Sequence, residues 1–152
     1  MKVSEIMTKA VVSDSADDTL KQAAAKMREQ QTGSILVMED QKLLGIFTER
    51  DLLKAIATGQ DPDAVRLKDV MTTDVITTTP GASLHEASEL MASRWIRHLP
   101  VVDGDRVLGL ISQRDLVGVL AQLLHEPDST GLDEGSLVRS RRIRRIEAGD
   151  LD

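Results

Sequence analysis

Residues 45–51 read GIFTERD and residues 109–115 read GLISQRD, so one pattern of glycine, two apolar residues, a hydroxyl, arginine and aspartate occurs twice. The two stretches are 64 residues apart, and at the same offset the IMT of residues 6–8 matches the VMT of residues 70–72. Agreement of separate segments at one ungapped offset indicates a tandem duplication. Two such halves would be related by a pseudo-twofold axis, and the seam between repeats is a common place for a ligand cleft.

Each copy is expected to fold in the order strand, helix, strand, strand, helix. The first helix of each copy begins with a capping box, formed by Thr19 with Gln22 and by Ser83 with Glu86. Apolar residues at helical spacing alternate with β-branched runs, which favours an α/β (α+β) fold of two β-α-β-β-α repeats. The strands are expected at residues 11–12, 34–39, 43–48, 75–77, 99–102 and 107–112, and the last helix of each copy at residues 50–58 and 114–124.

The duplication divides the chain into repeat 1 (residues 1–64), repeat 2 (residues 65–127) and an arginine-rich C-terminal tail (residues 128–152). The tail matches neither repeat. Three interpretations stay open for it: a solvated tail, a helix docked at an oligomer interface, or a nucleic-acid-binding segment. Its acidic residues and its lack of aromatic side chains disfavour the third.

Composition limits the class of protein. The chain has 152 residues and is 41% hydrophobic, which is enough for a core of ordinary size. Its formal net charge of −6 disfavours nucleic acid as the main partner. It has no cysteine and no apolar run long enough to cross a membrane, so we expect a cytoplasmic protein without a disulfide or thiolate chemistry.

The repeated motif has two readings, and the first is structural. Thr48 with Asp51, and Ser112 with Asp115, have the spacing of a helix N-cap residue and a carboxylate three positions later. Such a capping box stabilises a helix by about 1 kcal/mol and requires no ligand.

The second reading is a nucleotide site built from the same atoms. A helix N-terminus offers free N–H groups to a phosphate, and Arg50 and Arg114 would add charged donors. An aspartate in the first turn can accept hydrogen bonds from the two hydroxyls of a ribose. Spacing alone leaves both readings open.

The opening IMT, the RHLPVV of residues 97–102 and the doubled motif together resemble the cystathionine β-synthase (CBS) domain, present here as a tandem pair over residues 1–124. The resemblance implies a regulatory module that binds adenine nucleotides (AMP, ADP, ATP) or a related adenosyl ligand in two clefts. It also implies a homodimer, a flat disc of four repeats, with a regulated protein partner.

By position, the resemblance assigns the phosphate and ribose contacts to Thr48 and Asp51 in one cleft and to Ser112 and Asp115 in the other, with both motif arginines as phosphate donors. The segments that it places opposite are Thr73, Ile96, Arg97 and His98 for the first cleft, and Lys9, Thr32, Gly33 and Ser34 for the second.

The two copies differ at one strand. Repeat 2 begins it with His98-Leu99-Pro100, whereas repeat 1 has Ser34-Ile35-Leu36. By this assignment Arg97 and His98 make the Thr48 cleft the more cationic one. We therefore expect that cleft to hold the more phosphorylated or the more tightly bound ligand.

No catalytic arrangement is evident in the sequence. His85, His98 and His125 are the three histidines, and none has the spacing of a catalytic triad or a metal site. We expect a protein that is not an enzyme and has no catalytic cofactor. The alternative function is a ligand-free structural or adaptor dimer whose motifs serve only as helix caps.

Overall fold

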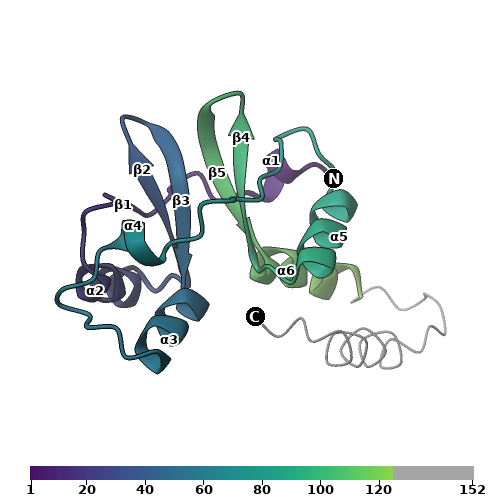
Figure 1. Cartoon of the computed structure of the whole chain (residues 1–152). Coiled ribbons are helices and arrows are strands. Elements are labelled where there is room, and N and C mark those ends of the chain that lie inside the picture. The colour runs from purple at the N-terminus through teal and green to yellow at the C-terminus, as the bar shows by residue number, and fades with distance from the viewer. Residues whose placement is uncertain (125–152) are drawn as a thin grey trace. The chain divides into compact units, whose positions relative to one another are not determined.

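The computed structural model describes residues 1–124. The tail over residues 128–152 and His125 lie outside the described residues, so the three interpretations of the tail stay open. The chain separates into a compact unit of residues 1–119 and a second unit from residue 120 onward. The first unit contains repeat 1 and repeat 2 as far as residue 119, with both hairpins labelled in Figure 1.

The order of elements confirms a tandem α+β fold with two similar repeats. A short helix, α1 (Val3–Ile6), opens repeat 1, and a second one, α4 (Leu67–Val70), opens repeat 2. Repeat 1 contains β1 (Ser13–Asp14), α2 (Leu20–Gln30), β2 (Ser34–Glu39), β3 (Lys42–Thr48) and α3 (Glu49–Ala57). Repeat 2 contains α5 (Leu84–Arg94), β4 (His98–Asp103), β5 (Arg106–Ser112) and α6 (Gln113–Leu123).

The expected hairpins and helix caps are present. The pairs β2/β3 and β4/β5 are antiparallel, and each has a register shift at the equivalent place, at Val37/Met38 and at Val101/Val102. The capping boxes that open α2 and α5 both form. The two copies therefore repeat the irregularities of the fold as well as its regular elements.

The first strand of each copy was placed wrongly. In repeat 1 the strand β1 lies at Ser13–Asp14, two residues beyond the expected position, and pairs in parallel with β2. In repeat 2 the strand expected at residues 75–77 is reduced to one parallel bridge between Thr78 and Val101. Runs this short gain so few hydrogen bonds that tertiary contacts, and not strand propensity, decide where they pair.

Each repeat has its own buried core. The core of repeat 1 forms between α2 and its sheet and includes Leu20, Ala23, Met27, Ile35, Val37 and Phe47. The core of repeat 2 forms between α5 and its hairpin and includes Ala87, Met91, Leu99, Val101 and Ile111. Neither core is closed by residues of its own repeat alone.

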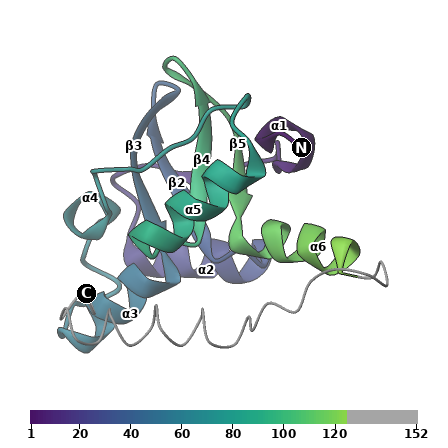
Figure 2. The same cartoon turned by 90° about the vertical axis from the view of Figure 1, so that its right-hand side faces the viewer.

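Each short helix packs into the core of the other repeat, and we call α1 and α4 the exchanged helices. Val3 of α1 is fully buried in the core of repeat 2, and Leu67 of α4 is fully buried in the core of repeat 1. Figures 1 and 2 both show α1 beside β4 and β5, and α4 beside the strands of repeat 1. Each repeat thus needs the short helix that stands at the start of the other repeat.

Backbone hydrogen bonds fasten the segment that follows each short helix. Thr8 and Leu110 exchange two such bonds, with N···O distances of 2.8 and 2.9 Å. Thr72 and Ile46 exchange the equivalent pair at 2.9 and 3.0 Å. The IMT and VMT segments therefore add a short extra strand pairing to β5 and β3, one residue beyond each motif glycine.

The motif glycines make this approach possible. A Cβ atom on Gly109 would lie 2.7 Å from the Thr8 carbonyl oxygen, and one on Gly45 would lie 2.8 Å from the Thr72 carbonyl oxygen. Both distances are shorter than any side chain tolerates against backbone. The glycine in each motif is therefore explained by close packing of the exchanged segment.

We expect Gly45→Ala and Gly109→Ala each to lower the free energy of unfolding by about 1–3 kcal/mol, because a methyl group would push the exchanged segment away. Urea denaturation measures the change. Gly81→Ala is the matched control, since nothing lies within 4 Å of a Cβ built there. Equal stability of all three variants would contradict the role given to the motif glycines.

Candidate ligand-binding cleft

A cavity of about 990 Å³ lies within the first unit and is lined by residues of both repeats. This volume is within the range of small-molecule sites in proteins. Repeat 1 contributes Thr8, Ala10, Val11, Val12, Ala24, Met27, Arg28, Gln30, Gln31, Thr32, Gly33, Ser34, Leu36, Glu49 and Leu52. Repeat 2 contributes Arg97, His98, Leu110, Ser112, Gln113, Arg114, Asp115 and Val117.

Both motifs form the capping boxes that their spacing predicts. One carboxylate oxygen of Asp51 accepts hydrogen bonds from the Thr48 backbone N–H at 2.8 Å and from its hydroxyl at 3.1 Å. Asp115 binds the N–H and hydroxyl of Ser112 in the same way, at 2.7 and 2.6 Å. The structural reading of the motif is therefore confirmed in both copies.

Capping does not close the cavity, because Ser112 and Asp115 still line it. Only Oδ2 of Asp115 takes part in the box. Its other carboxylate oxygen makes no hydrogen bond within residues 1–124, so capping and ligand contact are compatible functions of one side chain.

The first backbone N–H of each motif helix donates a hydrogen bond to the residue just before the first strand of the same hairpin. Glu49 N donates to the Gly33 carbonyl at 3.1 Å, and Gln113 N donates to the Arg97 carbonyl at 2.8 Å. These bonds hold residues 33 and 97 against the starts of α3 and α6. As a result, the residues just before β2 and β4 come to lie at the cavity wall.

Three arginines and two carboxylates line the cavity. Within the described chain, the side chains of Arg28 and Arg114 make no hydrogen bond or ion pair. Arg97 Nη2 lies 3.4 Å from Glu49 Oε2, a long and largely exposed contact. Unpaired guanidinium groups in a partly enclosed space favour an anionic ligand, because they lose little on binding it.

His98 lies at the centre of this charged group. Burial is the main cause that lowers the pKa of His98 below its ordinary value of 6.5, and the neighbouring positive charge of Arg97 lowers it further. Glu49 and Asp115 act in the opposite direction. The imidazole is therefore neutral at pH 7, and an anion bound beside it would favour its protonated form.

The structure brings together eight of the residues that the sequence assigned to ligand binding. They are Thr32, Gly33, Ser34, Arg97, His98, Ser112, Arg114 and Asp115. Six others do not line this cavity, namely Lys9, Thr48, Arg50, Asp51, Thr73 and Ile96.

Arg97 and His98 lie between the two motifs, since Arg97 Nη2 is 3.4 Å from Oε2 of Glu49, the residue that follows Thr48. Both line the cavity that contains Ser112 and Asp115. The reason is strand pairing, since β4 and β5 are antiparallel and His98 lies directly opposite Ser112. The cationic residues of the second hairpin are therefore close to the motif of their own repeat as well as to Glu49, and their assignment to the Thr48 cleft stays a prediction.

Sequence reasoning missed Arg28 and Gln31, which line the cavity from the end of α2. Gln31 has a left-handed backbone, φ 52°, and ends the helix as its C-cap. A basic residue in the last turn of a helix could have indicated an anion-binding position. The same residue is explained equally well by its favourable interaction with the helix dipole.

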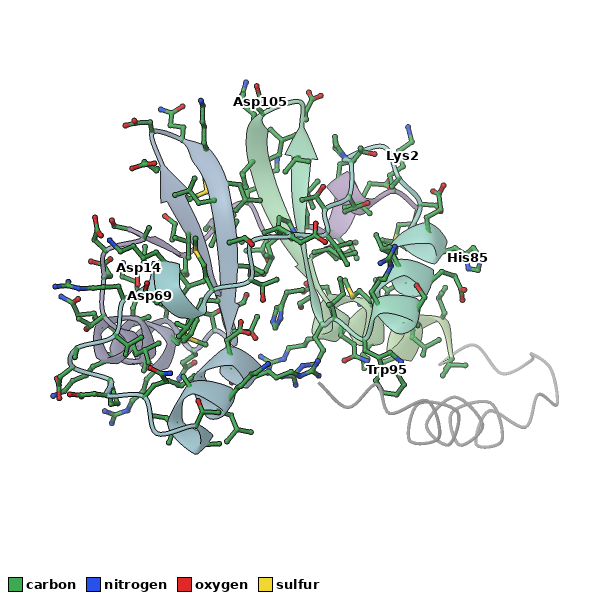
Figure 3. The ribbon with its side chains drawn as sticks, viewed as in Figure 1. Lys2, Asp14, Asp69, His85, Trp95 and Asp105 are labelled. Carbon is green, nitrogen blue, oxygen red and sulfur yellow. The ribbon has the colours of Figure 1, made fainter. Side chains whose placement is uncertain are left out.

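The motif arginine of repeat 1 is already engaged. Arg50 Nη1 donates to the carbonyl oxygen of Trp95 at 3.0 Å, across the seam. Trp95 ends α5 in a left-handed conformation with φ 55°, the position equivalent to Gln31. Figure 3 shows it at the end of α5 that faces the seam. The side chain of the equivalent Arg114 makes no hydrogen bond or ion pair within residues 1–124 and lines the cavity.

Two further findings concern metal and membrane. Residues 1–124 contain no group of three or more His, Cys, Asp or Glu side chains arranged to hold a metal ion. None of the helices in the same range combines the length and apolar character needed to cross a membrane.

The fold is a duplicated α+β unit, and residues at its strand-to-helix junctions line a cavity at the seam. These features define a tandem-repeat protein with an internal cleft. The family model of the CBS domain matches residues 3–58 and 67–122. The chain therefore belongs to the CBS-domain family, as a pair of such domains.

Similar proteins match over about three quarters of the chain. The chain is 35% identical over 122 residues to MK0525 of Methanopyrus kandleri, covering 78% of this chain and 62% of that protein, so it spans less than two thirds of MK0525. It is 36% identical over 115 residues to the CBS domain-containing protein YhcV of Bacillus subtilis, covering 75% of this chain and 81% of YhcV.

A solved structure extends the comparison to three dimensions. The CBS domain protein PAE2072 from Pyrobaculum aerophilum, complexed with AMP, superposes with a TM-score of 0.73 at 25% identity, covering 82% of this chain and 99% of that one.

The environment of His98 predicts a pH dependence of stability. The unfolded chain binds more protons than the folded one between pH 6.5 and the lower folded-state pKa. The free energy of unfolding should therefore fall as the pH drops through this window. Urea denaturation at several pH values measures it.

His98→Gln should remove this part of the pH dependence. His85→Gln is the control, because His85 is exposed on α5 and points away from the seam (Figure 3). An unchanged pH profile in His98→Gln would refute the assignment.

Proposed function

We propose that the protein is a regulatory module that binds an adenine nucleotide or a related adenosyl ligand in the cavity of Ser112 and Asp115. The observation that carries the proposal is that a motif of hydroxyl, arginine and aspartate lines a large cavity in which two arginines have no partner within the described chain. Membership in the CBS-domain family supports it, as does the AMP complex of PAE2072.

The lining suits the parts of such a ligand. The free oxygen of Asp115 can accept hydrogen bonds from ribose hydroxyls, and the guanidinium of Arg114 can donate to a phosphate. Apolar side chains of Val11, Val12 and Leu36 offer a surface for the base. In this proposal binding is regulatory, and the protein is not an enzyme.

Ligand binding would regulate a partner only through a change of conformation. A ligand shifts an equilibrium only as far as its affinities for two states differ. The exchanged segments around α1 and α4 link the two repeats, so a ligand that touches both repeats can alter how they are held. We propose that this change is what a regulated protein partner recognises.

Purified protein should be stabilised by at least one member of a panel of AMP, ADP, ATP, S-adenosylmethionine and NADH. At about 100 times its dissociation constant a ligand adds roughly 2.7 kcal/mol to folding stability. Thermal shift measures it. A panel without any stabilising member favours the alternative, an adaptor with ligand-free clefts, which the complete capping boxes would then explain.

A matched pair of variants tests the site. Asp115→Ala and Asp51→Ala each remove the same kind of capping box, so each should lose about 1 kcal/mol of folding stability. Only Asp115 lines the cavity. We expect Asp115→Ala to weaken ligand binding about tenfold or more, by isothermal titration calorimetry, and Asp51→Ala to leave this site intact. Equal losses would contradict the assignment.

We also propose that the protein acts as a homodimer. Leu53 and Ile56 lie on one face of α3 and are 70% and 50% exposed, and Val117 at the equivalent place on α6 is 56% exposed. Large apolar side chains grouped on helices are typical of interfaces. A second copy, which presents the same surface, is the simplest partner for such a face.

The double variant Leu53→Gln/Ile56→Gln should weaken the dimer at least about tenfold, because each side chain contributes roughly 1.5–3 kcal/mol when it is buried. Light scattering coupled to size exclusion, over a range of concentrations, gives the mass. Lys54→Gln on another face of α3 is the control. A wild-type chain that is monomeric at all concentrations would disprove the dimer.

A further inference from the structure

The cavity contains a carboxylate that belongs to neither capping box. Glu49 is the first residue of α3, directly after Thr48, and it lines the cavity from repeat 1. At the equivalent position repeat 2 has the neutral Gln113, which also lines the cavity. Glutamate and glutamine have nearly the same shape, so the two repeats differ here in charge and hardly in size.

The carboxylate of Glu49 lies across the seam, against repeat 2. Its Oε2 atom is 3.4 Å from Nη2 of Arg97. A Cβ atom on Gly33 would lie 3.2 Å from the same oxygen, close enough to crowd it. The absence of a side chain at Gly33 therefore leaves room for Glu49 to reach the basic residue of the other repeat.

The charge of Glu49 acts on groups that an anionic ligand would approach. Besides its contact with Arg97, it raises the pKa of His98, in opposition to the larger lowering by burial. A ligand anion beside Arg97 would carry the same sign of charge as this carboxylate. Like charges a few ångströms apart repel each other more strongly in a partly enclosed space than in open water. The Glu49 carboxylate and a ligand anion therefore compete for one position.

We propose that Glu49 is an internal competitor of the ligand, whose carboxylate holds Arg97 in the absence of an anionic ligand and must give way when one binds. This inference rests on the proposed function of the same cavity. It adds a residue that sets the affinity and the charge preference of that cavity. Glu49 should therefore weaken the binding of AMP and have little effect on the binding of adenosine, which has no phosphate.

The pair of Glu49 and Arg97 is suited to such an exchange. The two side chains are 61% and 48% exposed, and so exposed a pair contributes little to folding stability. The backbone N–H of Glu49 is bound separately, to the Gly33 carbonyl at 3.1 Å. The carboxylate can therefore move into solvent while the start of α3 keeps its place.

The test is isothermal titration calorimetry of AMP and adenosine into the full chain, with EDTA present so that no metal ion bridges the two anions. Glu49→Gln should strengthen AMP binding roughly five- to tenfold, because it removes one like charge near the phosphate. Adenosine binding should change less than about twofold, because adenosine offers no charge for the carboxylate to repel. Glu39→Gln, an exposed glutamate outside the cavity lining, is the control.

Gln113→Glu is the reciprocal variant. It places a carboxylate at the equivalent position of repeat 2, which also lines the cavity. We expect it to weaken AMP binding roughly five- to tenfold and to leave adenosine binding nearly unchanged. It keeps the inference testable if Glu49→Gln does not fold, since AMP binding that is insensitive to this added charge would count against competition by a carboxylate.

The outcomes separate the two proposals. AMP affinity that is unchanged in Glu49→Gln overturns the competitor and leaves the proposed function standing. Equal changes for AMP and adenosine also overturn it, because a purely structural effect would not distinguish the two ligands. Absence of binding by both compounds, in the wild-type chain and in Glu49→Gln, counts against both proposals.

Discussion

The exchange of α1 and α4 between the repeats is the constraint on which the rest of the structure depends. Val3 fills the core of repeat 2 and Leu67 fills the core of repeat 1, and both are fully buried. A repeat of about 60 residues would have a marginal core on its own. Because each core is completed by a helix of the other repeat, the two repeats depend on each other for stability, and residues of both line the cavity.

The motif serves this architecture and the cavity together. Its glycine allows the exchanged segment to approach the strand, and its hydroxyl and aspartate cap the following helix. The arginine between them takes no part in the capping box. In repeat 1 it donates to Trp95, and in repeat 2 Arg114 lines the cavity, so equivalent residues of the two copies have come to differ in role.

Pseudo-symmetry therefore does not mean two equal clefts. Replacement of Gly33 and Ser34 by Arg97 and His98 at the equivalent positions concentrates positive charge on one side of the seam. Electrostatic terms are sensitive to such differences, since a few charges in a partly enclosed space outweigh many on the surface. A duplicated chain can in this way develop one specialised site without altering its fold.

The sequence by itself determined the duplication, the hairpins and the helix caps of Thr19 and Ser83, because these depend on local spacing. It also located the hydroxyl and aspartate of each motif. Only the tertiary structure showed that Arg97 and His98 lie near both motifs, because His98 is paired across the hairpin with Ser112 while Arg97 reaches Glu49. It likewise revealed Arg28 at the cavity and the exchange of α1 and α4, because contacts between distant segments leave no periodic signal in the chain.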